Sequence, residues 1–335
     1  MKIGKIPENV LKRSILKQVH NRRNEVLVGP GVGEDCAILE LQEGETFLVS
    51  TDPITGATKD VGKLAVHITA NDIASSGGEL IGVLLTALLP PDTEEPQIKQ
   101  MMADVEEACA ELDMQVLGGH TEITDAVTRP VLTVTGIGKG KKEQLLTAKN
   151  VKPGQDVVVT KWIGLEGTWI LAKEREEELL TRYPRHLIDT AKGFDKYLSV
   201  VKEAATAIKS GASAMHDVTE GGIFGALWEV AEGAGVGLRI DLKKLPIKQE
   251  TVEICEYFRI SPYELISSGS MLIITDNGHD LVETLKEQGI HGTVVGKTTD
   301  SNDRIVVNGE ESRFLEPPKT DELYKALGMA DALKA

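Results

Sequence analysis

The sequence predicts a mixed α/β (α+β) protein with two domains, and three observations support this fold class. The chain has 335 residues, enough for two domains of ordinary size, and its 41% apolar content can build a core in each. Segments with the alternating pattern of strands and segments with helical periodicity follow one another in both halves. Pro153 and Gly154 separate an alternating strand from a fresh β run. We therefore expect an N-terminal domain over residues 1–150 and a C-terminal domain over residues 151–335.

In the N-terminal half, the spacing of apolar residues predicts helices that alternate with strands. Residues 7–20 begin with a proline that a first helical turn tolerates, and residues 60–77 carry an apolar stripe at helical spacing. Between them, short β runs in residues 26–51 are separated by glycine-bearing turns, which places Asp35 and Asp52 at strand ends. The other expected elements are a buried strand over 78–89, a helix over 98–112 and strands over 115–119 and 130–138.

The C-terminal half shows the same alternation, without a fixed-period repeat. A β run at residues 157–160 leads into a long helical region that ends near residue 209. Asp217 closes the strand that follows. The expected elements from there are strand 214–217, helix 222–235, strand 236–242, a helix, strand 271–276, another helix and a strand at 294–297.

Charge and cysteine content argue against several classes of protein. The formal net charge is −15, and no basic run is interleaved with aromatic residues, so we expect no nucleic-acid partner. The three cysteines lie far apart and form neither a C-x-x-C pair nor a zinc-ligand spacing, which favours a reducing cytoplasm. The sequence has no signal-peptide core and no stretch approaching the roughly 18 apolar residues of a membrane helix. We expect a cytoplasmic protein without a membrane segment.

Five short phrases place aspartate or histidine beside small, turn-forming or hydroxyl-bearing residues. They are GVGEDCA at 31–37, STDP at 50–53, ANDIASSGGE at 70–79, GGHTEIT at 118–124 and HDVTEGG at 216–222. Carboxylates in such settings hold magnesium through hard oxygen ligands, while glycine lets backbone N–H groups approach phosphate oxygens closely. The combination predicts a nucleoside triphosphate site, with Asp35, Asp52, Asp72 and Asp217 as its candidate acidic residues.

The aspartates also have ordinary structural readings. An aspartate at a strand end is usually a solvated turn or cap residue, and Asp72 can cap or form a local salt bridge. Asp217 can be the N-cap of the helix that follows it. A glycine-rich helix start such as TEGG is itself an anion site, so this reading is partly compatible with function.

The histidines and Glu122 are ambiguous in the same way. His120 can be a structural residue, a phosphate donor or a general acid–base, and Glu122 either joins the metal shell or is simply exposed. His67 stands four residues before Asn71 on one expected helix, where it either lines the same cleft or packs as a polar-face residue. These alternatives stay open from the residues alone.

In their order and spacing, the five phrases resemble the aminoimidazole ribonucleotide (AIR) synthase superfamily, which is also called PurM-like. The resemblance covers roughly residues 8–300. The superfamily includes the hydrogenase maturation factor HypE, selenophosphate synthetase and thiamine-monophosphate kinase. The resemblance implies an N-terminal α/β domain that pairs with its copy in a homodimer and a C-terminal α/β domain that covers the nucleotide. ATP would lie in a cleft between the domains and across the dimer interface.

The resemblance also implies roles for individual residues. Asp35, Asp52, Asp72 and Asp217 match the carboxylates that hold Mg²⁺ on the triphosphate. His120 would lie near the transferring group, and it is a candidate catalytic residue together with Asp72. The other positions that would contact the nucleotide are Lys63, Asn71, Gly118, Gly119, Thr121, Thr219, Gly221 and Gly222.

Within the superfamily, the TEGG and LAVHITANDIA phrases are most similar to HypE, but some features depart from each member. HypE carries its substrate on a C-terminal cysteine, whereas this sequence ends GMADALKA, so we expect no such carrier chemistry in cis. The first cysteine is Cys36, inside the metal motif, unlike the N-terminal Cys or selenocysteine of selenophosphate synthetase. The GGDT of thiamine-monophosphate kinase is GGHT here.

The resemblance implies a Mg-ATP-dependent enzyme that activates a small amide, thio or phosphorylated substrate by phosphoryl transfer. One alternative is a HypE-like ATP-binding maturation or assembly partner without turnover of its own. A phosphotransferase like thiamine-monophosphate kinase or selenophosphate synthetase also stays open. The sequence holds no motif that identifies the acceptor substrate.

Overall fold

The computed structural model describes residues 2–54 and 60–328, and it divides the chain into two compact units. The N-terminal unit holds residues up to 74 and residues 78–145, and the C-terminal unit holds residues 75–77 and everything from 146 on. Each unit mixes helices and strands, as the predicted fold class requires. None of the helices in the described ranges is long and apolar enough to cross a membrane.

A five-stranded sheet forms the centre of the N-terminal unit, in the order β1-β6-β5-β7-β4. Strands β5 and β6 are parallel, and the other neighbours are antiparallel. A separate two-stranded sheet joins β2 to β3. The elements are β1 (Gly4–Lys5), α1 (Glu8–Val10), β2 (Val26–Val28), β3 (Ile38–Leu39), β4 (Glu45–Ile54), α2 (Val61–Ser75), β5 (Glu79–Leu89), α3 (Glu95–Glu111), β6 (Gln115–Ile123) and β7 (Val131–Lys141).

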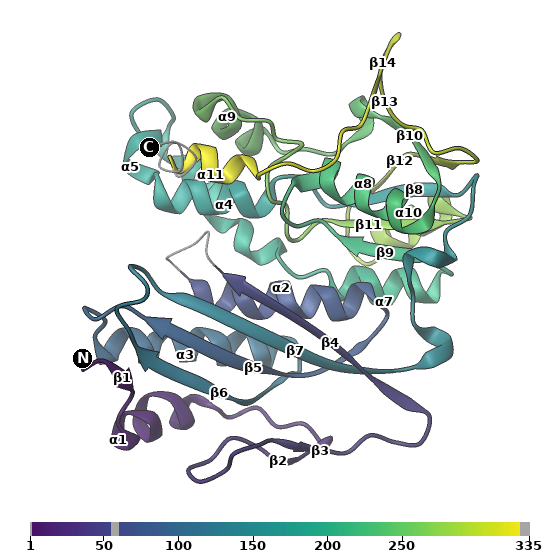
Figure 1. Ribbon diagram of the computed structural model, residues 1–335. Helices are drawn as coiled ribbons and strands as arrows, with labels where there is room; N and C mark the ends of the chain where they lie inside the picture. The colour runs from purple at the N-terminus through teal and green to yellow at the C-terminus, as the bar shows by residue number, and fades with distance from the viewer. Residues whose placement is uncertain (1, 55–59, 329–335) are drawn as a thin grey trace. The chain divides into compact units, whose positions relative to one another are not determined.

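Helices α2 and α3 pack side by side against one face of this sheet (Figure 1). Their backbones approach closely at Gly62, where an added Cβ would lie 2.6 Å from the Met101 carbonyl oxygen. Apolar residues of both helices, including Leu64, Ile73 and Val105, are buried between the helices and the sheet. The opposite face of the sheet is much more open, because Phe47 and Val49 of β4 are exposed there.

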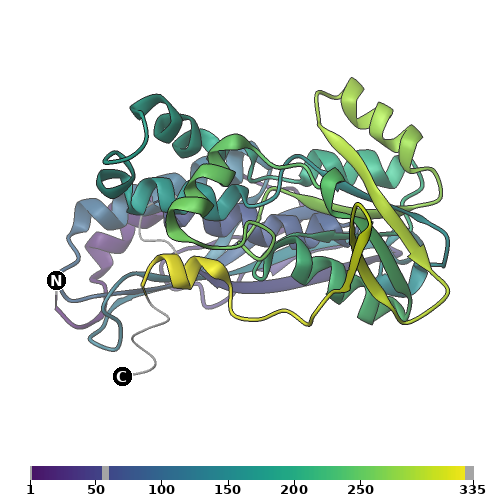
Figure 2. The same ribbon diagram turned by 90° about the horizontal axis from the view of Figure 1, so that it is seen from above.

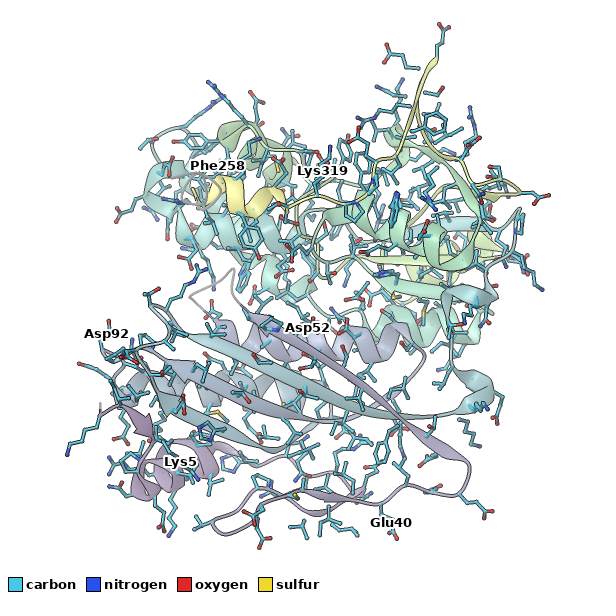
Figure 3. The ribbon with its side chains drawn as sticks, in the orientation of Figure 1. Lys5, Glu40, Asp52, Asp92, Phe258 and Lys319 are labelled. Atoms are coloured by element: carbon cyan, nitrogen blue, oxygen red, sulfur yellow. The ribbon has the colours of Figure 1, made fainter. Side chains whose placement is uncertain are left out.

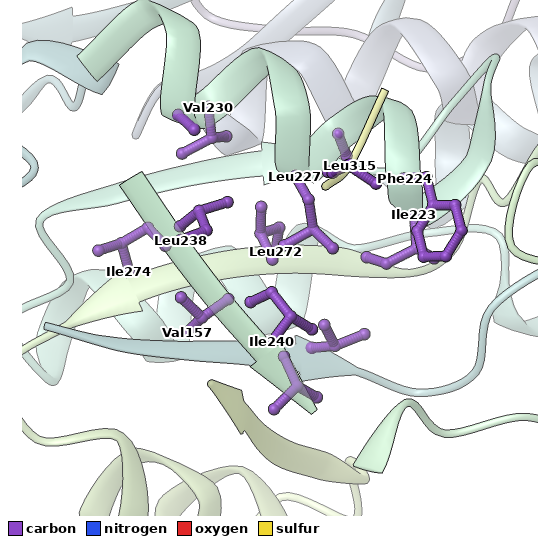
Figure 4. Packing of buried hydrophobic residues seen from close by; sticks show 14 of the residues in the cluster. Val157, Ile223, Phe224, Leu227, Val230, Leu238, Ile240, Leu272, Ile274 and Leu315 are labelled. Atoms are coloured by element: carbon purple, nitrogen blue, oxygen red, sulfur yellow. The ribbon is translucent and has the colours of Figure 1, made fainter. Parts of the chain in front are cut away.

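The C-terminal unit is built on a seven-stranded sheet in the order β14-β13-β10-β12-β8-β11-β9. Helix α8 packs its apolar residues onto this sheet, where Leu227 and Val230 meet Leu238 and Leu272 (Figure 4). The elements are β8 (Asp156–Thr160), α4 (Leu165–Glu174), α5 (Glu176–Leu179), α6 (Arg185–Lys192), α7 (Val201–Lys209), β9 (Ala214–Asp217), α8 (Gly222–Ala234), β10 (Gly237–Asp241), α9 (Gln249–Phe258), β11 (Met271–Thr275), α10 (Gly278–Glu287), β12 (Gly292–Thr299), β13 (Arg304–Asn308), β14 (Glu311–Phe314) and α11 (Glu322–Ala326).

The structure differs from the sequence-based expectations at three places. The leading helix is irregular, since α1 continues as a π-helical turn and then a 3-10 turn that ends at Gln18. Asp35 lies in the connection between β2 and β3, three residues before β3, so its predicted place at a strand end is wrong. The last expected strand is followed by the hairpin β13–β14 and the short helix α11, and Figure 2 shows this yellow segment running over green elements of the same unit.

Candidate functional site

Asp52 and Asp72 belong to one cluster on the helix-covered side of the N-terminal sheet. Ser50 pairs with Gly136 across the ladder, and an added Cβ at Gly136 would lie 2.4 Å from Thr69 of α2, so this face of β4 meets α2. Residues two apart on a strand share a face, which places Asp52 beside Ser50. The Ser50 hydroxyl donates a hydrogen bond to Asp72 Oδ2 in the last turn of α2. We call Ser50, Asp52 and Asp72 the α2 cluster (Figure 3 labels Asp52).

The GGHT phrase lies on β6, which is three strands away from β4 in the sheet. Asp52 of β4 pairs with Val134 of β7, Val134 pairs with Leu85 of β5, and Leu85 pairs with Gly119 of β6. In the next row, the same three steps lead from Pro53 to His120. Three steps between neighbouring strands span roughly 14 Å. Because adjacent residues on a strand point to opposite faces, the His120 side chain lies on the face opposite to Asp52. One N-terminal unit therefore does not bring these two predicted groups together.

Asp35 does lie with the GGHT phrase, around one open cavity of about 430 Å³. The connection between β2 and β3 contributes Gly31, Glu34 and Asp35 to its wall. The predicted site residues that line it are Asp35, Gly118, Gly119, His120 and Thr121. Strand β1 pairs with β6 only at Glu122 and Ile123, so no described strand flanks the rest of the β6 edge beside this cavity. We call the five predicted residues that line this cavity the β6-edge cluster.

Within this cluster, His120 is half-exposed, and its Nε2 lies 3.1 Å from Glu122 Oε2. This contact fits a histidine whose ring is oriented by a carboxylate. Gly119 has a φ of +151°, and an added Cβ would lie 2.0 Å from the Leu85 carbonyl oxygen, so sheet packing alone requires glycine there. At Gly118 an added Cβ would meet only the Leu84 side chain, at 3.3 Å.

The other predicted residues of α2 differ strongly in burial. Asn71 is fully buried and His67 is 4% exposed, with its Nε2 3.8 Å from Glu111 Oε2. Lys63, two turns earlier, is partly exposed. The burial of His67 thus favours its reading as a packed residue over its reading as a residue that lines a cleft.

Asp217 and the TEGG phrase belong to the C-terminal unit. Asp217 ends β9 as predicted and is 5% exposed. Its alternative reading as the N-cap of α8 is wrong, because Gly221 holds that position with a φ of +83°. The Gly221 N–H donates to Asp321 Oδ2 at 2.7 Å, and the Gly222 N–H donates to the Thr219 carbonyl at 3.0 Å.

Two buried carboxyl groups of this unit were not predicted from the sequence. Asp321 accepts N–H bonds from Gly221 and from Leu323, the latter at 2.8 Å, and burial raises its pKa to about 6. Glu166 of α4 accepts the Ser268 N–H at 3.3 Å, and burial raises its pKa to about 7. Asp321 is the second residue of the phrase TDEL, which is an ordinary N-cap signal for α11 and gives no hint of the contact with Gly221.

The N-terminal carboxylates fit a magnesium ion that is held mainly by a nucleotide. Asp52 Oδ2 is buried, and no described residue supplies it with a hydrogen bond. In the described ranges, no group of three or more His, Cys, Asp or Glu side chains is placed to hold a metal ion. Mg²⁺ commonly takes only one or two protein carboxylates and fills its other positions with phosphate oxygens and water. These residues suit that mode better than a closed protein site.

Known proteins match the chain over most of its length. A putative hydrogenase expression/formation protein of Methanocaldococcus jannaschii is 25% identical over 312 residues, which is 91% of each chain. A selenide, water dikinase of Methanococcus maripaludis is 26% identical over 93% of this chain and 97% of its own. A carbamoyl dehydratase HypE of Rhodobacter capsulatus is 25% identical over 78% of this chain and 76% of its own.

Solved structures confirm the two-domain fold. HypE in complex with ATP superposes with a TM-score of 0.79 at 17% identity, over 96% of this chain and 97% of that one. Thiamine-monophosphate kinase from Stenotrophomonas maltophilia gives a TM-score of 0.72 at 19% identity, over 93% and 99% of the two chains. Family models of the AIR synthase related protein match residues 33–139 with its N-terminal domain and residues 152–308 with its C-terminal domain. The chain therefore belongs to the AIR synthase related, PurM-like family.

Proposed function

We propose that the protein is a Mg-ATP-dependent enzyme that activates a small amide, thio or phosphorylated substrate by phosphoryl transfer. The observation that carries the proposal is the β6-edge cluster, where Asp35 and His120 meet the glycine pair 118–119 at one open cavity. The relatives named as a carbamoyl dehydratase and a selenide, water dikinase, and the ATP complex of HypE, support ATP chemistry.

The residues of the cluster suit phosphoryl transfer because that reaction asks mainly for positioning and charge neutralisation. Bound Mg²⁺ would supply the charge neutralisation, and Asp35, Asp52, Asp72 and Asp217 are the residues proposed to hold it. In the transfer, a nucleophilic oxygen or sulfur of the substrate attacks the γ-phosphorus. The bond to the β-bridging oxygen breaks, and ADP leaves with the electron pair. His120, oriented by Glu122, would accept the substrate's proton or hydrogen-bond a γ-oxygen.

We further propose that a second copy of the chain completes the N-terminal half of the site. The Asp52 and His120 side chains lie on opposite faces of one sheet and three strand spacings apart, so a single unit does not join them. The open sheet face also exposes large apolar side chains, with Val49 at 64% and Phe47 at 49%. Exposed apolar surface of this kind marks an interface between proteins. A homodimer that covers this face would place clusters from two chains near each other.

The direct test measures binding of Mg-ATP and release of ADP, first alone and then with a metabolite pool. We expect Asp72→Asn and Asp35→Asn to lose turnover. If each site takes one cluster from each chain, mixing the two inactive variants restores about a quarter of the wild-type activity, because half of the dimers are mixed and each has one intact site. Mixing Asp72→Asn with Asp52→Asn is the matched control, since both changes fall in the α2 cluster and no intact site forms.

Different results would contradict the nucleotide site and the sharing of the site between two chains. Absence of Mg-ATP binding in the wild-type protein would overturn the nucleotide site itself. Turnover without rescue in the mixed dimers would mean that one chain holds a complete site. The alternative function is a maturation or assembly partner that binds ATP without turnover, and the relative from M. jannaschii, named as a hydrogenase formation protein, favours it. Tight ATP binding with no ADP release in any pool would support that alternative.

A further inference from the structure

The cavity of the β6-edge cluster is lined by two chemically different groups of residues. Its polar lining, which we call the mouth, is Asp35, His120 and the backbone around Gly118 and Gly119. Its aliphatic lining, which we call the floor, comes mainly from the N-terminal segment, α3 and β6. These floor residues are Ile6, Leu11, Ile15, Leu16, Val19, Met102, Val116 and Leu117. The proposed phosphoryl transfer uses the mouth and leaves the floor without a role.

The lining indicates what the floor does not bind. No Phe, Tyr or Trp is among the described residues that line it, so it offers no aromatic ring on which a nucleobase stacks. Its charged side chains are Lys5 (labelled in Figure 3), Glu34 and Asp35, beside the half-exposed His120. Without nucleotide or Mg²⁺ in place, two carboxylates thus face one ammonium group in this lining. An anion in the cavity would be repelled.

The β6 edge indicates which head group the cavity favours. From Val116 to Gly119 no described strand flanks β6 on this side, so outward backbone N–H and C=O groups face the cavity. An uncharged group that both donates and accepts hydrogen bonds matches such an edge. A carboxylate, which only accepts, satisfies half of the pattern and carries the disfavoured charge.

From these observations we infer that the cavity is the acceptor pocket, and that it takes a small uncharged molecule with an aliphatic body on the floor and a donor–acceptor head at the β6 edge. This inference rests on the proposed function for the role of the molecule as phosphoryl acceptor, but its binding does not require ATP. Of the proposed substrate classes, it favours uncharged amides and thio compounds and excludes phosphorylated molecules. The cavity volume falls within the range of about 300–1,000 Å³ that is usual for small-molecule pockets.

The test uses hexanamide as the probe and hexanoate as its charged counterpart of equal length, titrated into the full-length protein by calorimetry at pH 7.5. We expect hexanamide to bind about tenfold more tightly than hexanoate. Affinity should rise about fourfold for each methylene from butanamide to hexanamide, because each CH₂ is buried on the aliphatic floor. Equal binding of the two head groups, or no binding of hexanamide, would overturn the inference.

Three substitutions locate the binding. Leu16→Trp and Leu11→Trp fill the floor from partly exposed positions and should weaken hexanamide binding about tenfold or more. Lys17→Trp adds the same side chain at the exposed neighbouring position and should leave binding unchanged. Unchanged binding in both leucine variants would place the probe elsewhere and refute the pocket.

A measurement on the wild-type protein covers the case in which the leucine variants do not fold. Met102 lines the cavity and its neighbour Met101 does not, although both are buried on α3. With ¹³C-methyl labelling, hexanamide should shift the Met102 methyl resonance and leave that of Met101 unchanged. Mg-ATP titrated separately distinguishes the two proposals: ATP binding without hexanamide binding refutes only the acceptor pocket, and the reverse result refutes only the nucleotide site.

Discussion

The two glycine-rich phrases GGHT and TEGG look alike in the sequence, but the structure uses them differently. In the C-terminal unit, the Gly221 N–H at the start of α8 already donates to the buried Asp321 carboxylate. In the N-terminal unit, Gly118 and Gly119 lie on a strand edge that borders an open cavity. A helix start with free N–H groups attracts anions, and here the chain supplies one anion itself.

The ligand-binding capacity of a glycine motif therefore depends on what its N–H groups already bind within the chain. At TEGG the intramolecular carboxylate makes part of the motif structural. At GGHT the two glycines have different roles. Sheet packing against the Leu85 backbone requires glycine at position 119, whereas a Cβ at position 118 would meet only a side chain. Substitutions at each glycine and at Asp321 test these two roles separately.

The largest effect is expected for Gly119→Ala. The added Cβ would meet the Leu85 carbonyl oxygen at 2.0 Å, and alanine is strained at a φ of +151°, so the β5–β6 pairing has to open. We expect a loss of about 4 kcal/mol in the free energy of unfolding, measured by urea denaturation with circular dichroism. Gly118→Ala is the matched control: its Cβ is 3.3 Å from a movable Leu84 methyl, so stability should hold while Mg-ATP affinity falls. Equal stability losses in the two variants would contradict this division of roles.

A smaller loss is expected for Asp321→Ala. The change removes the acceptor for the N–H groups of Gly221 and Leu323 and leaves both buried, which costs about 3 kcal/mol. All three tryptophans lie in the C-terminal unit, so tryptophan fluorescence during urea unfolding reports on this unit specifically. Asp321→Asn keeps one acceptor oxygen and should lose less. A wild-type unfolding curve for Asp321→Ala would show that the bond to TEGG contributes nothing to stability.

Strong local periodicity explains how much of the fold the sequence predicts. The helix expected over residues 60–77 is α2 (Val61–Ser75), and the strand expected over 78–89 is β5 (Glu79–Leu89). Both segments carry long apolar patterns that few other structures satisfy. The hairpin β13–β14 and helix α11 are short and charged, so their patterns are weak and their formation depends on packing within the unit.

The candidate site was predictable in its residue types and not in its grouping. Which face of β4 carries Asp52 depends on strand register, and a shift of one residue reverses the face. The sequence contains no signal for this register. Likewise, the Asp321 contact with Gly221 joins residues 100 positions apart, and it depends on how the last segment folds back over α8. Such long-range geometry has no local pattern in the chain.

The smallest effect concerns pH, and its sign should differ between the units. The folded-state pKa values of Asp321 and Glu166 are raised to about 6 and about 7 by burial, so each group favours folding most below its unfolded pKa and loses that contribution as pH rises through the folded value. In the N-terminal unit, the hydrogen bond and charge of Arg23 lower the pKa of Glu25 to about 2, so its contribution is present above about 4.5 and is lost as pH falls toward 2.

Hydrogen exchange followed by mass spectrometry resolves the two units. Between pH 7 and 5, protection that is corrected for the intrinsic exchange rate should increase around α4 and α11 of the C-terminal unit, with a slope of at most about 1.4 kcal/mol per pH unit for each carboxyl group. Below pH 4.5, strands β4 and β7 should lose protection, because Lys139 of β7 forms ion pairs both with Glu25 and with Glu45 of β4. In Asp321→Asn the increase near α11 should disappear while the acid loss in the N-terminal unit remains. The same pH response in both units would mean that the buried Asp321 carboxyl and the Glu25 ion pair do not determine how the stability of each unit depends on pH.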